Sequence, residues 1–496
     1  MSERHVVIVG GGLAGLSAGC YARAAGFHTT VVEHNIALGG VCTAWPRGPY
    51  IVDGCIHWLT GGTFAQLYDE LGIVPVVGLR VLKEWTAYRD VRNGRTLHVT
   101  QDLDALGREL RALAPEDGAE IGRIVTGARR FAELKQPFDQ LHRTFRDQLA
   151  EFWQMRDELG TVMHFRKPLA LYVREHLHSD TLRRILTQLL PPEAPALFLL
   201  MVLGYLERGH LSRPVGGTAA FRDALVASYQ QLGGASRLHA TVDEILVQGH
   251  EARGVRLSDG SFLMADAVIS TSSLPETILR LLGGRFGGDE IRARLARWRM
   301  FQPVVLASFG VALPLSDLPS LMVLDRVEPF EVGDVVNDSI YLRVGNDDTC
   351  FAPAGHTVVQ TMLASSYEWW ATRGARYTAE KDAVADVALS QLGKQIPGLV
   401  PATVRMVDIA TPLTFWTSAR AWRGAYEGWL PNAESFFGQV RKTLPGLHRF
   451  VMAGQWVEPG GGVPTALLSG RQAVQVLCSE LDVPFRLPRL AGTQSA

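Results

Sequence analysis

Residues 6–35 read VVIVGGGLAGLSAGCYARAAGFHTTVVEHN and place three glycines at the spacing Gly10-x-Gly12-x-x-Gly15. The β-branched runs 6–9 and 29–32 predict two short buried strands. The Ala- and Leu-rich segment 13–25 predicts a helix between them. The glycines therefore fall where the first strand turns into the helix.

Each glycine suits a separate steric demand of a dinucleotide-binding turn. Gly10 permits the tight turn, Gly12 lets a phosphate approach the backbone, and Gly15 lets the helix pack closely on the strand. Leu13 and Ala14 begin the helix, whose free N–H groups and positive end would face a pyrophosphate. A plain Gly-rich turn is the alternative interpretation.

The residues that follow indicate which dinucleotide is bound. Glu33 ends the second predicted strand, where a carboxylate can accept hydrogen bonds from a ribose diol. Gly39 and Gly40 form a second glycine pair soon afterwards. A nicotinamide domain does not need this pair, whereas the longer flavin cofactor passes close to such a backbone. The sequence therefore predicts FAD, with an ordinary turn as the alternative for the pair.

Composition narrows the class of protein. The chain has 496 residues, 47% hydrophobic and 20% charged, with a net charge of −1, which argues against a nucleic-acid partner. Its five cysteines show neither a CxxC pair nor metal-ligand spacing, so we predict no metal site and a reduced, cytoplasmic compartment. No run of 18 apolar residues predicts a transmembrane helix. The oligomeric state stays open.

The amino-acid composition changes twice in the middle of the chain. Residues 100–185 are charged and predict helices, and residues 300–440 predict a mixed sheet rich in aromatic side chains. Between them, Ile185–Leu206 is the most apolar stretch and is interrupted by prolines. It is either a buried core helix or a helix that lines an apolar tunnel or dips into a membrane surface.

The C-terminal segment 448–478 reads HRFVMAGQWVEPGGGVPTALLSGRQAVQVLC. Residues 450–453 predict a strand, 460–462 a glycine loop, and 465–478 a helix with Pro464 near its start. The positive end of such a helix would stabilise negative charge on a reduced flavin in front of it.

Together, VIVGGGLAGLSAG (7–19), PVGGTAAFRDAL (214–225), GVRLSDG (254–260) and AGQWVEPGGGVPTALLSGRQA (453–473) resemble the phytoene desaturase-like family of FAD-dependent oxidoreductases. That family includes carotenoid desaturases, carotenoid isomerases and retinol saturases. The resemblance implies an α/β fold with a Rossmann-like FAD-binding domain of the amine oxidase/phytoene desaturase type. Residues 1–75, 210–285 and 440–496 would form this discontinuous domain. Residues 76–209 would form the helical part, and 286–439 the mixed-sheet part, of a substrate-binding domain.

The resemblance also implies where the cofactor lies. Val242 would meet the adenine through its backbone. The remaining cofactor-binding residues would be Gly10, Gly12, Leu13, Ala14, Gly15, Glu33, Gly39, Gly40, Gly454, Gly462, Val463 and Pro464. Family members often carry a basic residue after the glycine pair, and this chain has Val41 there.

The implied chemistry is hydride transfer from a C–H bond of an apolar isoprenoid or polyene to flavin, with loss of a neighbouring proton. Glu458 and His57 are candidates to handle the proton, but both also suit structural roles, so no catalytic residue is assigned. With one dinucleotide fingerprint, we expect no bound nicotinamide cofactor. The alternatives are a redox-neutral isomerase, a saturase, a tailoring enzyme, an amine oxidase, or a non-enzymatic lipid escort. Peripheral membrane contact would accompany an apolar substrate.

Overall fold

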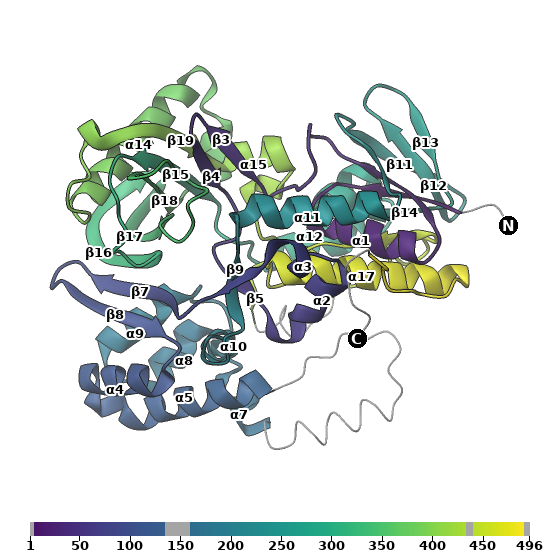
Figure 1. The fold of residues 1–496 in the computed structure, drawn as a ribbon. Coiled ribbons are helices and arrows are strands. Elements are labelled where there is room, and N and C mark those ends of the chain that lie inside the picture. Colours follow the sequence, from purple (N-terminus) through teal and green to yellow (C-terminus); the bar gives the residue numbers. More distant parts are fainter. Residues whose placement is uncertain (1–3, 134–158, 433–439, 491–496) are drawn as a thin grey trace.

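The computed structural model describes residues 4–133, 159–432 and 440–490 (Figure 1). A five-stranded parallel sheet with the order β10-β2-β1-β14-β20 organises the nucleotide-binding region. Its strands are β1 (His5–Val9), β2 (His28–Val32), β10 (Ala235–Arg237), β14 (Ala267–Ser270) and β20 (Phe450–Met452). These strands come from all three stretches predicted for the FAD-binding domain, although the domain division itself stays a prediction.

Strand β1 is buried on both faces, as its β-branched sequence predicts. Val6 and Ile8 pack into a core with the helices of this region. Val7 and Val9 point the other way, into a core shared with a small antiparallel sheet. That sheet has the order β11 (Val242–Gln248), β12 (Glu251–Leu257) and β13 (Phe262–Met264).

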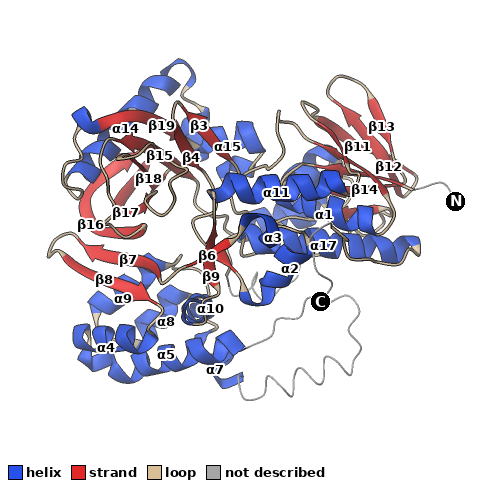
Figure 2. Ribbon diagram, viewed as in Figure 1, coloured by secondary structure: helices blue, strands red, loops and turns tan. Residues whose placement is uncertain are grey.

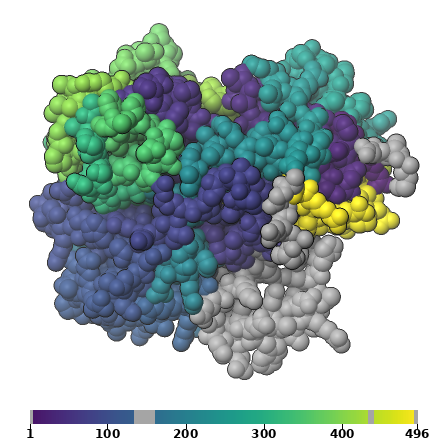
Figure 3. All heavy atoms as spheres, in the orientation of Figure 1, coloured from purple at the N-terminus to yellow at the C-terminus, as the bar shows by residue number. Residues whose placement is uncertain are grey.

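Helix α1 (Leu13–Ala24) lies between α11 (Gly217–Gln231) and the C-terminal helix α17 (Gly462–Leu481). Figures 1 and 3 show the yellow α17 beside the purple N-terminal elements. The crossing of α1 and α17 is close because a Cβ atom at Gly470 would lie 2.5 Å from the carbonyl oxygen of Ala14. The two ends of the chain therefore build one layer.

The second large element is a seven-stranded mixed sheet, drawn in red in Figure 2. Its order is β19 (Val404–Ala410), β15 (Val304–Val311), β18 (Thr357–Ala364), β17 (Val335–Val344), β16 (Leu321–Val332), β7 (Glu84–Asp90) and β8 (Arg95–Thr100). Helix α14 (Tyr377–Gly393) packs against it around Trp370 and Leu392.

Residues 84–100 differ from the sequence-based expectation. They lie inside the range 76–209 that was predicted to be helical, yet they form the hairpin β7–β8 at the edge of the mixed sheet. The physical reason is the parallel pairing of β7 with β16, which joins Met322–Asp325 to Ala87–Asp90. The helical part and the mixed sheet are therefore linked by backbone hydrogen bonds.

The helical part contains α4 (Leu103–Leu113), α5 (Gly118–Glu133), α7 (Leu159–Phe165), α8 (Leu169–His176), α9 (Asp180–Leu189) and α10 (Ala196–Glu207). Asp102 caps α4 by accepting a hydrogen bond from the backbone N–H of Ala105 at 2.8 Å. Leu199 and Leu203 on α10 are 1% and 4% exposed, so these side chains belong to the core rather than to a membrane-facing surface. Among the described residues, none of the helices combines the length and apolar character needed to cross a bilayer.

Shorter elements connect these layers. Two of them, β5 and β6, pair with β9 in a three-stranded sheet between the nucleotide-binding and helical regions. The remaining bounds are β3 (Ala44–Arg47), β4 (Tyr50–Asp53), β5 (Leu59–Thr60), α2 (Ala65–Glu70), α3 (Val74–Val77), β6 (Leu79–Val81), β9 (Leu211–Pro214), α12 (Gly288–Arg297), α13 (Tyr367–Ala371) and α15 (Pro412–Ala419).

The α1–α17 crossing predicts opposite effects for one substitution at two helical glycines. Gly470→Ala places a methyl group against backbone atoms of α1, and such overpacking costs roughly 1–3 kcal/mol. Gly160→Ala, in α7, meets nothing within 4 Å and gains helix propensity of about 1 kcal/mol. We expect the melting temperature to fall for Gly470→Ala and to stay or rise for Gly160→Ala. Equal shifts would contradict the close crossing.

Candidate functional site

One cavity of about 1110 Å³ runs from the parallel sheet toward the helical part. It brings together residues that lie far apart in the sequence. Of the residues predicted to bind the cofactor, all except Gly15 line it: Gly10, Gly12, Leu13, Ala14, Glu33, Gly39, Gly40, Val242, Gly454, Gly462, Val463 and Pro464.

The first glycine turn has the geometry that a phosphate-binding loop requires. Gly10 has a φ of +98°, which favours glycine, whereas Gly12 has the ordinary φ of −72°. A Cβ atom at Gly15 would lie 2.0 Å from the carbonyl oxygen of Gly10. At Gly12 the nearest protein atom would be 3.9 Å away. Gly15 is therefore needed by the fold, and the space at Gly12 is open to a ligand.

The second glycine pair lies directly against the first turn. The backbone N–H of Gly39 donates to the carbonyl oxygen of Gly11 at 2.8 Å, and a Cβ atom at Gly40 would lie 3.0 Å from Gly12 Cα. Val41 lines the cavity in place of the family's basic residue. A basic side chain nevertheless lies beside the pair, because Arg222 of α11 packs over Gly39. The sequence analysis did not identify this arginine.

Glu33 is buried at the end of β2 and faces the cavity. Its Oε2 accepts a hydrogen bond from the backbone N–H of Gly11 at 2.7 Å, and its Oε1 accepts one from Asn35 at 2.8 Å. These bonds fix the orientation of the carboxylate, and each oxygen keeps a further lone pair for a ribose hydroxyl. Val242 lies at the same end of the cavity, where its carbonyl accepts a hydrogen bond from Arg280 at 2.8 Å.

The C-terminal loop closes the other side of the cavity. Gly460, Gly461 and Gly462 have φ values of +117°, +65° and +86°, so the loop depends on glycine. Helix α17 begins at Gly462, three residues earlier than the sequence predicts, and its first residues line the cavity. Its N-terminus therefore directs unpaired N–H groups and a positive dipole end toward the space in front of it.

His57 lines the cavity and stacks on Tyr341, with ring centroids 5.7 Å apart. Burial, helped by the positive charges of Arg343 and Arg213, lowers the pKa of His57 well below its ordinary value. The imidazole is therefore neutral at pH 7 and is a poor proton acceptor. The other acid/base candidate from the sequence, Glu458, is held in an ion pair with Lys442.

Glu427 is the residue that the sequence analysis missed. It lines the cavity next to the glycine loop, since a Cβ atom at Gly461 would lie 2.7 Å from Glu427 Cβ. Burial raises its pKa to about 7. Such a carboxyl group can exchange a proton near neutral pH. An acid inside the aromatic run YEGW at 426–429, shortly before the C-terminal motif, was the signal available in the sequence.

The end of the cavity near the helical part is largely apolar. Phe198 and Met201 of α10 line it, together with the loop that precedes this helix. The apolar stretch 185–206 therefore contributes both to the core, through Leu199 and Leu203, and to the cavity wall. The end of α9 and the loop after it contribute Thr187, Gln188, Leu189, Leu190, Pro191, Pro192 and Glu193 to the lining.

Comparison with known proteins agrees with this geometry. The family described as flavin containing amine oxidoreductase matches residues 13–478. The chain is 24% identical over 506 residues to the lycopene-forming phytoene desaturase of Pseudescherichia vulneris, covering 97% of this chain and 100% of that protein. It is 29% identical over 513 residues to the zeta-carotene-forming phytoene desaturase of Myxococcus xanthus, covering 96% and 94%. Cyclohexylamine oxidase from Brevibacterium oxydans shares the fold, with a TM-score of 0.58, 17% identity and coverage of 97% and 100%.

The fold and the cavity define a dinucleotide-binding oxidoreductase. The chain belongs to the flavin containing amine oxidoreductase family and is an FAD-dependent enzyme. The resemblance to phytoene desaturase-like flavoproteins is thereby confirmed, and the non-enzymatic escort is set aside.

The residues present fit FAD. The open backbone at Gly12 and the N-terminus of α1 suit a pyrophosphate, and Glu33 suits a ribose diol. When bound, FAD supplies an acceptor for a hydride. The protein contributes the positive end of α17, a neutral His57 and the carboxyl group of Glu427, whose pKa burial raises to about 7.

Substitutions at two nearby glycines, Gly12 and Gly15, should distinguish an effect on cofactor binding from an effect on folding. Gly12→Ala adds a methyl group to space that the protein leaves open, so we expect an unchanged melting temperature of the apoprotein and FAD binding weakened at least about tenfold. Gly15→Ala forces the helix off the strand and should lower the melting temperature of the apoprotein itself. Thermal unfolding and FAD fluorescence titration measure both effects. Wild-type affinity in Gly12→Ala would place the pyrophosphate elsewhere.

Proposed function

We propose that this chain is a desaturase that removes two hydrogens from an elongated, apolar isoprenoid or polyene. The observation that carries the proposal is the continuity of one cavity from the glycine turns to an apolar wall formed by α10. Burial of each methylene group is worth about 0.8 kcal/mol, so an apolar chain leaves a bilayer only for an equally apolar surface. The names of the two relatives, both phytoene desaturases, support the same substrate class.

In this reaction a hydride leaves one carbon and a proton leaves its neighbour, and a double bond forms between them. We assign Glu427 as the base that accepts this proton. It lies in the cavity beside the loop that begins α17, and it forms no hydrogen bond or ion pair within the described residues. Its lone pairs are therefore available to a substrate. The contrast with Glu458, which Lys442 engages, favours Glu427.

Amine oxidation is the second candidate. Tyr426 and Phe415 line the cavity as a tilted ring pair with centroids 6.1 Å apart, next to Glu427. Aromatic faces and a carboxylate are groups that bind an ammonium ion. The apolar wall from α10 favours the polyene, because a small amine would leave that wall exposed to water.

A single-turnover assay distinguishes the two functions. FAD-loaded protein is mixed anaerobically with phytoene in phosphatidylcholine liposomes or with cyclohexylamine, and flavin absorbance is followed. We expect the phytoene in the liposomes to bleach the flavin and to become a polyene with a longer conjugated system, because the bound flavin is then the two-electron acceptor. Flotation of the protein with the same liposomes tests the peripheral membrane contact that we propose for substrate delivery. Bleaching by the amine alone would establish the amine oxidase instead.

Glu427 sets the pH dependence that we predict for this step. A base with a pKa of about 7 is protonated and inactive at low pH, so the rate of flavin reduction should rise with pH and level off above about 7. In Glu427→Gln this rising limb of the pH–rate profile should disappear, and the rate should fall by about 10²–10⁴-fold. Glu458→Gln is the matched control and should keep the limb. A limb that survives in Glu427→Gln would exclude Glu427 as the base.

The free energy of unfolding should fall as the pH rises, whereas the rate of flavin reduction should increase. The folded-state pKa of Glu427 is raised above its ordinary value, so the folded protein holds a proton that the unfolded chain has lost. Wild-type stability should therefore decline from about pH 4.5 to above pH 7 relative to Glu427→Gln. Thermal unfolding of both proteins across this range provides a readout that does not depend on substrate.

A further inference from the structure

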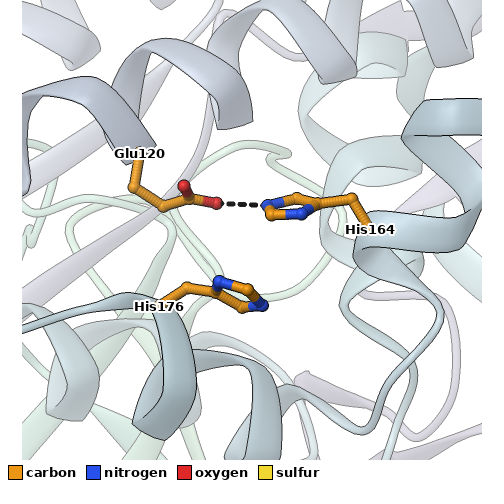
Figure 4. A group of neighbouring side chains, drawn as sticks. All are labelled: Glu120, His164 and His176. Atoms are coloured by element: carbon orange, nitrogen blue, oxygen red, sulfur yellow. Dashed lines mark hydrogen bonds and ion pairs between the residues drawn. The ribbon is translucent and has the colours of Figure 1, made fainter.

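Three potential metal ligands converge in the helical part, outside the cavity. They are Glu120 from α5, His164 from α7 and His176 from α8 (Figure 4). One ligand atom of each residue lies within 4.8 Å of the others. Glu120 is buried and both histidines are half-buried. None of the three lines the cavity.

A simple ion pair accounts for two of these residues. His164 Nε2 lies 2.6 Å from Glu120 Oε1, and the Tyr172 hydroxyl donates to the same oxygen at 2.6 Å. Arg123 donates to the other oxygen, Oε2, at 2.5 Å. The carboxylate of Glu120 is therefore held in place from three sides, by His164, Tyr172 and Arg123.

His176 is not explained by that ion pair. Its ring lies 4.5 Å from the His164 ring and 5.1 Å from the Tyr172 ring, centroid to centroid. Within the described residues His176 makes no hydrogen bond or ion pair. A half-buried imidazole that lies beside a carboxylate and a second imidazole, with no hydrogen-bond partner among the described residues, is well placed to bind a cation.

We propose that Glu120, His164 and His176 bind a divalent transition metal, with Zn²⁺ as the best chemical match. Two imidazoles and one carboxylate are a ligand set that Zn²⁺ accepts, with water in the fourth position. At ligand distances of about 2.0–2.1 Å, tetrahedral ligand atoms lie about 3.4 Å apart. Because all the ligand atoms lie within 4.8 Å of one another, side-chain rotation has to close the widest gap by at most about 1.4 Å.

The side chains around the three ligands, Tyr172 and Arg123, would affect metal binding in different ways. The ion would replace the direct contact between His164 Nε2 and Glu120 Oε1, which are 2.6 Å apart and would have to separate to admit it, while Tyr172 remains as a hydrogen-bond donor that orients the carboxylate. Arg123 opposes the cation, but its side chain is 62% exposed and can withdraw into water. Bound metal would join three helices and stabilise the helical part. Spacings of 44 and 12 residues between the ligands explain why the sequence predicted no metal site.

The test uses the full chain loaded with FAD and stripped of metal with a chelator. Titration calorimetry with ZnCl₂ should give one site per chain for the wild type, and Zn²⁺ should raise the melting temperature. His176→Ala should weaken binding at least about tenfold and abolish the thermal shift. His98→Ala is the matched control, since His98 pairs with Glu84 at an exposed position. It should bind Zn²⁺ like the wild type.

A second variant moves the affinity the other way. Arg123→Gln removes the competing cation, so it should bind Zn²⁺ more tightly than the wild type while lowering the melting temperature of the metal-free protein. Equal Zn²⁺ affinity in wild type and His176→Ala would overturn the proposal, because the metal would then lie elsewhere, for example on cysteine thiols. Absence of binding in the wild type would leave Glu120 as an ion-pair partner only. Neither outcome affects the proposed desaturase.

Discussion

At Gly15, helix α1 passes so close to the end of β1 that a Cβ atom would lie 2.0 Å from the carbonyl oxygen of Gly10. This contact fixes the angle at which α1 leaves the sheet and therefore where its N-terminus points. A second glycine permits a similar close contact, since Gly470 lets α17 pack directly on α1. Because both helices are held by backbone contact, their N-termini meet at one cavity. An anionic cofactor can then be bound by N–H groups from both ends of the chain.

The charges around the cavity follow from burial. Arg213 and Arg343 lie close enough to His57 and Tyr341 for their charges to act on both, and both arginines are almost fully buried. Their charge and the low polarity of the site keep His57 neutral. Lys442 neutralises Glu458. Within the described part of the cavity, Glu427 is thus the acid without a partner, and burial places its proton affinity near neutral pH.

The sequence predicted what depends on local spacing. The turn at Gly10–Gly15, the acid Glu33 and the helix after Pro464 each have signals within a few residues, and all three segments meet at the cavity. What the sequence did not predict depends on distant partners. Strands β7 and β8 join the mixed sheet because β7 pairs with β16, more than two hundred positions away. Glu427 likewise lies in the cavity beside Gly461, a residue of another segment.

Helix α10 connects the two regions for which we make proposals. Phe198 and Met201 face the cavity, whereas Leu199 and Leu203 are buried in the core of the helical part. On the core side, Gly204 packs so closely on α5 that a Cβ atom there would lie 2.1 Å from the carbonyl oxygen of Ala128. Helix α5 also carries Glu120. The three proposed metal ligands and the apolar cavity wall are therefore separated by one tight helix–helix contact. Since packed helices shift as units rather than deforming gradually, whatever fixes α5 also restricts the position of the wall that the substrate would touch.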